Sequence, residues 1–314
     1  MKKVLMYEYG DVDVLKEENV PIPEPKDNEV QIKIIATSVN DPDISLRQYG
    51  PFPTMPKEMR PVLPHMAGED FSGIITATGK DVQRYKEGEH VIGITLSGTT
   101  AEYITLNENS LIYKIPDEVD IVSMGAIGVT AATAWAAVVS NGKVTNGQKV
   151  LIHGAAGGVG SMAVQFAKYF GAYVIATAGG YSKDYLKDLG ADEVIDYRTE
   201  DFTKVVKDAD LVVNLTGSET LEKSYQVVKK GGILTSTNGM PDMDKAKAFG
   251  INANYTMGFV TQEDVDKIIA IYKEGKLKIN ITKTYPFELE SIKQAHLDFE
   301  TGSNQGKRLI IIGA

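Results

Sequence analysis

The sequence predicts an α/β protein of two domains, in which a β-rich domain precedes a doubly wound parallel sheet. Short segments of alternating polar and apolar residues, separated by turns, fill the chain up to about residue 120. Short apolar strands then alternate with helical segments, which is the pattern of a parallel sheet covered on both faces. The chain has 314 residues, and about 150 residues per domain also gives two domains.

In the first domain, residues 29–34 alternate polar and apolar side chains, as a strand with one buried face does. Turn residues separate this segment from further expected strands at 71–77, 90–96 and 101–106. Prolines cluster before residue 65, which argues against long helices. We therefore expect this domain to be all-β.

In the second part of the chain, apolar residues recur at helical spacing between short apolar runs. Strands are expected at 148–153, 172–178, 193–196, 210–215 and 233–236, and helices at 126–140, 161–170, 183–189 and 218–228. The remaining segment is expected to form helices at 262–274 and 289–300, an extended stretch at 277–285 and a terminal strand at 307–312.

Composition and charge exclude several classes of function. Lys and Arg number 33 against 42 Asp and Glu, so the net charge is −9 at pH 7, which disfavours nucleic acid and anionic membranes as partners. The absence of cysteine excludes disulfides, thiolate nucleophiles and Cys-ligated zinc. The apolar start of the chain ends at Glu8, and the run at 129–139 is shorter than the ~20 residues of a membrane span. We therefore expect a cytoplasmic protein.

A glycine-rich turn carries the clearest functional signal. Residues 154–160 read Gly-Ala-Ala-Gly-Gly-Val-Gly and lie between an expected strand and helix, the context of a dinucleotide-binding fingerprint. Ala156, Gly157, Gly158 and Val159 are expected to hold a pyrophosphate, because free N–H groups gather where the helix begins. An alanine replaces the first glycine of the strict pattern. The alternative is a tight turn needed only for packing.

The strand after this turn indicates which dinucleotide is bound. NAD sites place an acidic residue at the end of the second strand, ~20 residues on, but here that strand ends at Gly179-Gly180 without an acid. A 2′-phosphate favours a cation, which Lys183 supplies, and Tyr197 and Arg198 can reach the same face. We therefore expect NADPH as the cofactor. The alternative for Lys183 is an ordinary solvated surface lysine.

Taken together, short segments along nearly the whole chain make it similar to one family. The chain resembles the zinc-free medium-chain dehydrogenase/reductases, in their quinone oxidoreductase (zeta-crystallin-like) branch. The matching segments are residues 36–40, 68–73, 88–93, 101–103, 128–135, 152–160 and 189–192, with Gly306-Lys307 before the last strand.

The resemblance implies a GroES-like catalytic domain at 1–124, an inserted Rossmann NADP-binding domain at 125–262, and a C-terminal return to the catalytic domain at 263–314. It also implies hydride transfer from NADPH to a quinone or an activated, α,β-unsaturated carbonyl alkene, in a cleft between the domains. Similar proteins form homodimers, so we expect a homodimer.

The resemblance also argues against a metal. Zinc-binding relatives have a ligand histidine after the glycine of a Gly-His-Glu motif, whereas Glu69 follows Gly68 here. The region of the cysteine ligand carries Asn40-Asp41, and the 4 histidines are dispersed along the chain. We therefore expect no metal site and no alcohol oxidation through a zinc-bound alkoxide.

Three residues of the first domain are the catalytic candidates that the resemblance implies. It places Asn40 near the nicotinamide, and the alternative is a turn asparagine beside Pro42. Asp43 and Tyr49 follow on a segment expected to line the cleft, and Tyr49 is the expected hydrogen-bond donor to the substrate oxygen. The alternative for Tyr49 is a half-buried aromatic.

Other residues are expected around the nicotinamide and the substrate. Thr130, Asn238 and Phe259 resemble family positions that hold the nicotinamide end. The proline-stiffened loop at 50–56 is either a cap for an apolar substrate or a simple connector. The sequence thus predicts an NADPH-dependent quinone or enone reductase, and the alternative is a non-enzymatic NADPH-binding sensor or structural protein.

Overall fold

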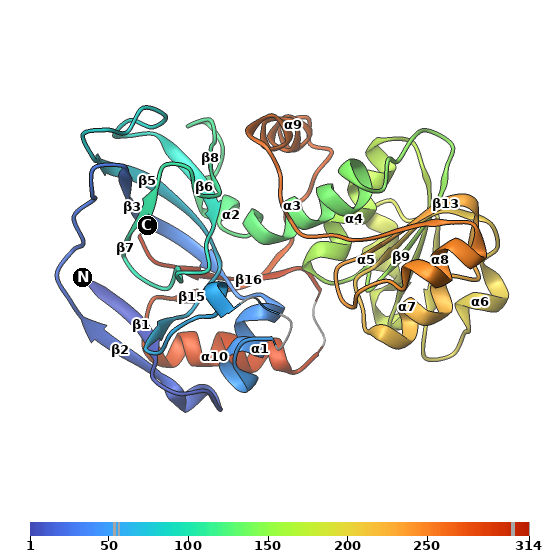
Figure 1. Cartoon of the computed structure of the whole chain (residues 1–314), viewed down its shortest axis with the longest axis horizontal. Coiled ribbons are helices and arrows are strands. Elements are labelled where there is room, and N and C mark those ends of the chain that lie inside the picture. The colour runs from blue at the N-terminus through green and yellow to red at the C-terminus, as the bar shows by residue number, and fades with distance from the viewer. Residues whose placement is uncertain (53–54, 56, 303–304, 314) are drawn as a thin grey trace. The chain divides into compact units, whose positions relative to one another are not determined.

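The chain folds as two compact units (Figure 1). The computed structural model describes residues 1–52, 55, 57–302 and 305–313. Unit 1 comprises Met1–Val129 and Ile281–Ala314, and unit 2 comprises Thr130–Asn280. The predicted fold class is confirmed, because unit 1 is built on largely antiparallel sheets and unit 2 on a parallel sheet.

Unit 1 contains a large sheet and a small one. The strands of the large sheet are β3 (Glu29–Ser38), β5 (Asp70–Thr78), β6 (His90–Ile94), β7 (Tyr103–Asn107), β8 (Ile112–Lys114), β15 (Ile281–Pro286) and β16 (Lys307–Ile311). Their order is β15-β16-β3-β5-β6-β8, and β7 also pairs with β3. The small sheet consists of β1 (Lys2–Met6), β2 (Leu15–Asn19) and β4 (His65–Met66).

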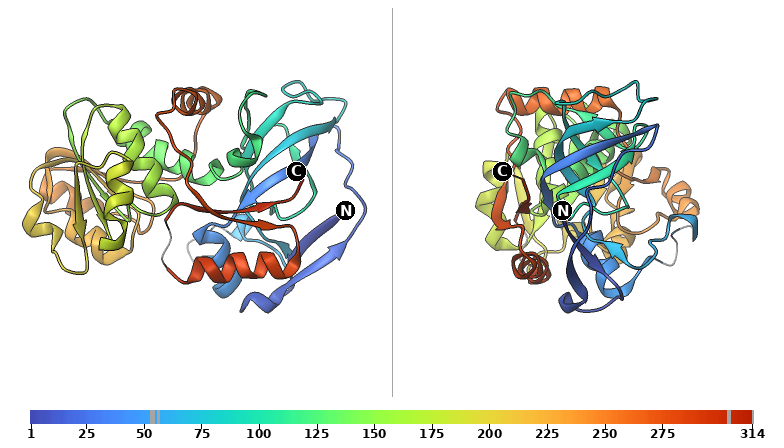
Figure 2. Two further views of the ribbon diagram at one scale, coloured as in Figure 1. Left: turned by 180° about the vertical axis from the view of Figure 1, so that it is seen from behind. Right: turned by 90° about the vertical axis from the view of Figure 1, so that its left-hand side faces the viewer.

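The terminal strand joins the end of the chain to its beginning. Leu309 of β16 pairs with Ser38 of β3 in an antiparallel register. Helix α10 (Leu289–Glu300) contacts β15 and β16 and lies beside them in both views of Figure 2. Residues near position 40 are therefore held next to residues near position 307.

The all-β expectation for the first domain is wrong in one place that bears on function. Helix α1 (Asp41–Tyr49) follows β3 directly. Pro42 lies in its first turn, where the N–H that proline lacks has no intrahelical partner anyway. The Asn40 N–H donates to Asp43 Oδ2 at 2.8 Å, which caps the helix start. Short helix α2 (Ile121–Met124) is also present.

Unit 2 is a parallel sheet of six strands. Its strands are β9 (Lys149–His153), β10 (Tyr173–Ala178), β11 (Glu193–Asp196), β12 (Ala209–Asn214), β13 (Val228–Ser236) and β14 (Asn252–Tyr255). The order is β11-β10-β9-β12-β13-β14, which is that of a doubly wound dinucleotide-binding sheet. The strand order reverses between β9 and β12, where such sheets bind their ligands.

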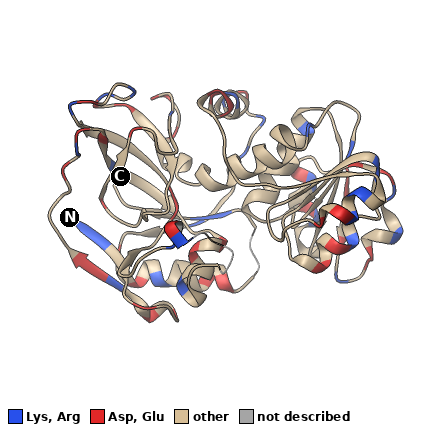
Figure 3. Ribbon diagram, viewed as in Figure 1, with Lys and Arg blue, Asp and Glu red and all other residues tan. Residues whose placement is uncertain are grey.

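Helices precede, connect and follow these strands. They are α3 (Gly128–Trp135), α4 (Gly158–Tyr169), α5 (Lys183–Asp188), α6 (Phe202–Val205), α7 (Ser218–Ser224), α8 (Met243–Phe249) and α9 (Gln262–Lys273). Acidic and basic residues are interspersed along α7 and α8, as on ordinary solvated helix surfaces (Figure 3). Buried apolar side chains such as Leu151, Val212 and Leu234 form the core around the sheet. Within the described residues, every helix is too short or too polar to cross a bilayer.

Candidate active site

The glycine-rich turn of unit 2 joins β9 to α4 at the switch point of the sheet. Gly154 has a φ of +70°, which favours glycine. A Cβ on Gly160 would lie 2.2 Å from the Gly154 carbonyl oxygen, so only glycine allows the helix to approach the turn this closely. The sequence prediction for the turn and helix is therefore confirmed in its geometry.

This turn can accommodate a pyrophosphate. Gly157 is the N-cap of α4 and has no side chain to cap the helix. In the described part of the chain, the N–H groups of Gly158, Val159 and Gly160 donate to no protein acceptor. A Cβ on Gly157 would meet only one atom within 4 Å, the Gly154 carbonyl oxygen at 3.6 Å. Free donors at the positive end of a helix are the arrangement that dinucleotide phosphates require.

The ends of β10 and β11 supply the groups nearest to an expected ribose. Ala178, the last residue of β10, pairs with Asp196, the last residue of β11. Asp196 accepts two hydrogen bonds from the Arg198 guanidinium, both at 3.1 Å. These hydrogen bonds lower the pKa of Asp196. Lys183 is exposed at the start of α5, and Tyr197 is 64% exposed.

The sequence prediction of the cofactor rests on the end of the second strand alone and does not include Asp196. The end of β10 carries no acid, as expected. However, the neighbouring strand brings the Asp196 carboxylate to the same edge. This carboxylate lies so close to Gly180 that a Cβ on Gly180 would be only 2.4 Å from Asp196 Oδ2. Parallel pairing of consecutive strands is the signal that could have found it.

The predicted nicotinamide-binding residues differ in their surroundings. Thr130 is buried within α3, and Phe259 is 59% exposed. A Cβ on Gly258 would lie 2.6 Å from Thr133 Oγ1, so the loop that carries Phe259 packs against α3. Asn238 is exposed, and its carbonyl oxygen accepts a hydrogen bond from Asn214 Nδ2 at 3.2 Å.

Unit 1 holds a polar cluster, which we call the acidic cluster. Its members are Asn40, Asp43, Glu69, Asp70 and Lys307. Asn40 is 4% exposed and is hydrogen-bonded to Asp43, Asp70 and Lys307. Its Nδ2 donates to Asp70 Oδ1 at 3.1 Å, and its Oδ1 accepts from Lys307 Nζ at 2.5 Å. The Asn40 amide is thus fully engaged within the protein.

Lys307 and Asp70 hold this cluster from two strands. Lys307 Nζ also donates to the Val39 carbonyl oxygen at 3.1 Å. Asp70 accepts from the Ser38 hydroxyl at 2.7 Å and from the Val129 N–H at 3.2 Å. One buried ammonium therefore lies beside several carboxyl groups.

Burial changes the acidity of the cluster. It raises the pKa of Asp43 to about 7, and the charge of Asp70 adds to this effect. Burial also raises the pKa of Glu69 well above its usual range, helped by Asp43 and Asp70 and opposed by Lys307. The pKa of Lys307 is lowered by burial and supported by the surrounding carboxylates.

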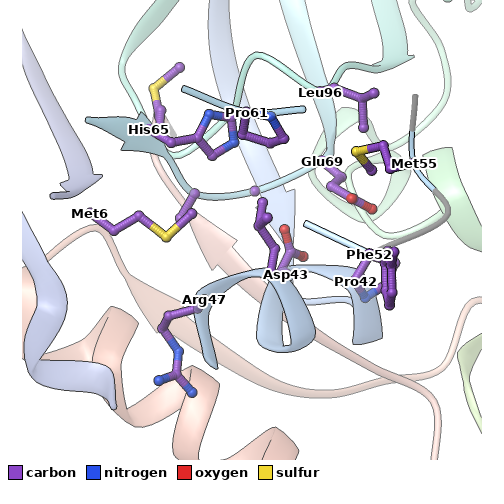
Figure 4. A pocket seen from close by; sticks show the side chains of 14 residues that line it. Met6, Pro42, Asp43, Arg47, Phe52, Met55, Pro61, His65, Glu69 and Leu96 are labelled. Carbon is purple, nitrogen blue, oxygen red and sulfur yellow. The ribbon is translucent and has the colours of Figure 1, made fainter. Parts of the chain in front are cut away.

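A pocket opens beside the acidic cluster (Figure 4). Its apolar lining comes from Met6, Pro42, Leu46, Phe52, Met55, Pro61, Met66, Ala67 and Leu96. The carboxyl groups of Asp43 and Glu69 point into it, whereas the Arg47 guanidinium points away (Figure 4). Arg47 donates to the Gly10 carbonyl oxygen at 2.6 Å and pairs with Glu300.

The structure separates the three catalytic candidates. Asn40 and Asp43 lie in the acidic cluster, and Asp43 lines the pocket. Tyr49 is the last residue of α1, its side chain is 82% exposed, and it is not among the residues lining the pocket. Of the predicted capping loop, Phe52 and Met55 line the pocket, and residues 53–54 and 56 lie outside the described residues. Glu69 and Lys307 were not candidates, although Gly306-Lys307 had been matched to the family.

The arrangement of possible metal-ligating side chains bears on whether the protein holds a metal. Among the described residues, no group of three or more His, Asp or Glu side chains is arranged to hold a metal ion. His153 and His296 are both buried, which lowers the pKa of each to about 3. His153 instead contacts Thr177 Oγ1 at 2.9 Å inside unit 2.

Comparisons with known proteins give a consistent result. Residues 26–117 match the alcohol dehydrogenase GroES-like domain, and residues 189–310 match a zinc-binding dehydrogenase family. Human quinone oxidoreductase is 29% identical over 99% of this chain and 98% of its own length. The chloroplastic NADPH-dependent alkenal/one oxidoreductase of Arabidopsis thaliana is 31% identical over 99% of this chain and 79% of its own. The quinone oxidoreductase structure from Coxiella burnetii superposes with a TM-score of 0.88, at 30% identity and 99% coverage of both chains.

Proposed function

Because this chain belongs to the quinone oxidoreductase family of the medium-chain dehydrogenase/reductases, we propose that it transfers hydride from NADPH to a quinone or an α,β-unsaturated carbonyl compound, without zinc. The observation that carries this proposal is the uncapped first turn of α4 at the switch point of the parallel sheet. Phosphates bind at such helix starts. The names of the human and Arabidopsis relatives support the two substrate classes.

Each cofactor residue has a separate task in this proposal. Ala156, Gly157, Gly158 and Val159 bind the pyrophosphate through the backbone and the helix dipole. A bound nicotinamide supplies the hydride, while the protein supplies orientation and electrostatics.

Selection of NADPH and placement of the nicotinamide fall to other residues. Lys183 and Tyr197 bind the 2′-phosphate, which is the part that NADH lacks. Thr130, Asn238 and Phe259 hold the nicotinamide end. The Arabidopsis relative's name, which specifies NADPH, supports this choice of cofactor.

The zinc-free part of the proposal rests on the donor set. Glu69 stands after Gly68, cysteine is absent, and Asn40 is already bonded to Asp70 and Lys307. The apolar pocket of unit 1 suits a neutral organic substrate. In this proposal Asn40 positions the acidic cluster and Asp43 faces the substrate. Tyr49 donates a hydrogen bond to the substrate oxygen, and the Tyr49→Phe variant tests this role. The same proposal places the protein in the cytoplasm as a homodimer. Light scattering at micromolar concentration checks the dimer.

One assay tests the function directly. NADPH oxidation is followed by the loss of the absorbance of the reduced cofactor, with a panel of quinones and enones and without added metal. Turnover that survives a chelator supports the proposal. Tight NADPH binding without turnover on any member of the panel would instead favour the sensor function, and zinc at one equivalent per chain with chelator-sensitive activity would contradict the zinc-free reaction.

A further inference from the structure

Glu69 is the one acid of the acidic cluster that both faces the pocket and makes no hydrogen bond through its carboxyl group among the described residues. Its backbone is fixed, since its carbonyl oxygen accepts from the Thr95 N–H at 2.8 Å. The preceding Gly68 has a φ of +90°, and a Cβ there would lie 2.2 Å from Thr99 Oγ1. The chain is therefore built to hold the Glu69 side chain at this place in the pocket (Figure 4).

The nearby cations are used elsewhere. Lys307 Nζ donates to Val39 and Asn40, and the Arg47 guanidinium is directed to Gly10 and Glu300. Glu69 thus lacks an ion-pair partner within the described part of the chain. Burial in an apolar pocket beside Asp43 and Asp70 favours the neutral form of Glu69, which has a proton to give, and the opposing charge of Lys307 is hydrogen-bonded to Val39 and Asn40.

We propose that Glu69 is the acid that protonates the substrate during reduction of a neutral, largely apolar enone bound in the unit 1 pocket. This inference rests on the proposed function. Asp43 is the weaker candidate because its Oδ2 accepts the Asn40 N–H at the start of α1. Anionic substrates are disfavoured, because an anion would have to leave water for a mostly apolar lining.

The step balances as follows. A bound dihydronicotinamide would supply the hydride that forms the C–H bond at the β-carbon of the enone, and the C=C electron pair would then move to the carbonyl oxygen as an enolate. The Glu69 O–H bond breaks, and its proton goes to the α-carbon as the enolate collapses to the saturated ketone. The products are the ketone, the oxidised cofactor and the Glu69 carboxylate, which takes a proton back from solvent. The raised pKa of Glu69 suits an acid that must be protonated near neutral pH.

Several titratable or charged groups face Glu69 and contribute to any pH dependence. They are Asp41 and Asp43 from α1, Asp70 from β5, His65 from β4 and Lys307 from β16. A pH profile of the wild type alone does not separate them. The comparison must therefore be made between variants that differ only at Glu69.

The test compares wild type, Glu69→Gln, Glu69→Asp and Tyr49→Phe, with NADPH and 2-cyclohexen-1-one, across neutral and alkaline pH. Glu87→Gln is the matched control, because Glu87 is exposed on a turn away from the pocket lining. We expect Glu69→Gln to lower kcat by about 100-fold or more, the usual contribution of a general acid. KM should change little, because glutamine has nearly the size and shape of glutamic acid and leaves the apolar lining of the pocket in place. Glu69→Asp should restore part of the rate, and Glu87→Gln should match the wild type.

The pH dependence of kcat/KM tests whether the protonated form of Glu69 is the active one. As the pH rises and Glu69 loses its proton, kcat/KM of the wild type should fall, and Glu69→Gln should lack this limb. A second readout needs neither cofactor nor substrate: the infrared difference between wild type and Glu69→Gln near neutral pH should contain the C=O band of a protonated carboxyl. If Glu69→Gln does not fold, the same band is sought with Glu69→Asp as the partner.

Distinct results separate failure of the inference from failure of the function. If the wild type reduces no enone or quinone, the proposed function fails. If the wild type is active but Glu69→Gln keeps its rate, or the protonated band is absent, the inference is overturned. A loss of turnover in Tyr49→Phe, with Glu69→Gln unaffected, would assign the proton to Tyr49 instead.

Discussion

Lys307 Nζ donates to Asn40 Oδ1 at 2.5 Å, although 267 positions separate the two residues in the chain. This contact ties the terminal strand β16 to the N-cap of α1 and places an ammonium next to three carboxyl groups. The contact therefore stabilises the docking of β16 in unit 1, and it limits the repulsion between the carboxyl groups of the acidic cluster.

Lys307→Met should lower the free energy of unfolding by about 3–5 kcal/mol, the usual cost of removing one partner of a buried charged group. The variant leaves Asn40 Oδ1 and the Val39 carbonyl without their donor. Urea unfolding at pH 7 measures the change. Lys247→Met, an exposed lysine on α8, is the matched control and should cost less than about 0.5 kcal/mol. Equal losses in the two variants would show that the buried contact contributes nothing specific.

Asp43→Asn should gain stability relative to the wild type as the pH rises. The pKa of Asp43 is about 7 in the folded protein, against the ordinary 3.8 of an aspartate in the unfolded chain. Between these values the unfolded chain is ionised and the folded one is not, so the wild type loses about 1.4 kcal/mol of stability per pH unit from this residue as the pH increases. The stability that the protonated Asp43 contributes is fully present below pH 3.8 and is lost by about pH 7. Urea unfolding at pH 5 and pH 7 should show the difference between the variant and the wild type shifting by about 2–3 kcal/mol, and a constant difference would contradict the raised pKa.

Much of the fold follows from local pattern. Alternation in residues 29–34 and the apolar runs around 150 and 212 predict strands that the structure contains. Helix α1 was not predicted because proline density was weighed without its position at a helix start, where Pro42 is tolerated. Strand β14 was also not predicted. It reads Asn-Ala-Asn-Tyr and has only one buried residue, so an edge strand of this kind leaves no apolar signal.

The sequence predicts only those parts of the candidate site that lie within one continuous segment of the chain. The glycine-rich turn carries its own geometry, so its role could be inferred from residues 154–160. The acidic cluster depends on β3, β5 and β16 meeting, and no local pattern connects Glu69 to Lys307. The exposure of Tyr49 likewise depends on which way the end of α1 faces. Tertiary contacts, not propensity, decide these positions.

His153 should make unit 2 sensitive to acid. Burial lowers the pKa of His153 in the folded protein to about 3, from the ordinary 6.5 of a histidine in the unfolded chain. Its stabilising contribution is therefore fully present above pH 6.5 and is lost as the pH falls toward 3, because the unfolded chain takes up the proton first. In His153→Gln this loss is absent, so the stability advantage of the wild type should shrink by about 2 kcal/mol between pH 7.5 and pH 5. Chemical denaturation at the two pH values measures it, and an advantage that does not change with pH would refute the assignment.

Lys183→Ala should weaken NADPH binding by about 10- to 150-fold, since a charge-assisted hydrogen bond contributes ~1.5–3 kcal/mol. NADH, which lacks the 2′-phosphate, should bind almost as before. Fluorescence titration of the wild type and the variant with both cofactors measures this. Tyr197→Phe should act in the same direction but more weakly, because it removes a neutral donor. Lys187→Ala is the control on the same helix, where the lysine is directed to the Asp192 carbonyl oxygen. Equal weakening of both cofactors would assign Lys183 to the fold or to the shared adenosine site.

Asp196→Asn should strengthen NADPH binding and leave NADH nearly unchanged. Asp196 neutralises Arg198 at the edge where β10 and β11 end, next to the place proposed for the 2′-phosphate. Removing the carboxylate charge lowers its repulsion on the phosphate and releases the guanidinium. The pair is exposed to solvent, so a gain of no more than about fivefold is expected. Arg198→Ala should do the reverse, because the Asp196 carboxylate then faces the phosphate uncompensated. Titration of both variants with NADPH and NADH measures these changes in affinity, which should shrink at high salt. Weaker NADPH binding in Asp196→Asn would instead show that the Asp196–Arg198 ion pair orders the phosphate site.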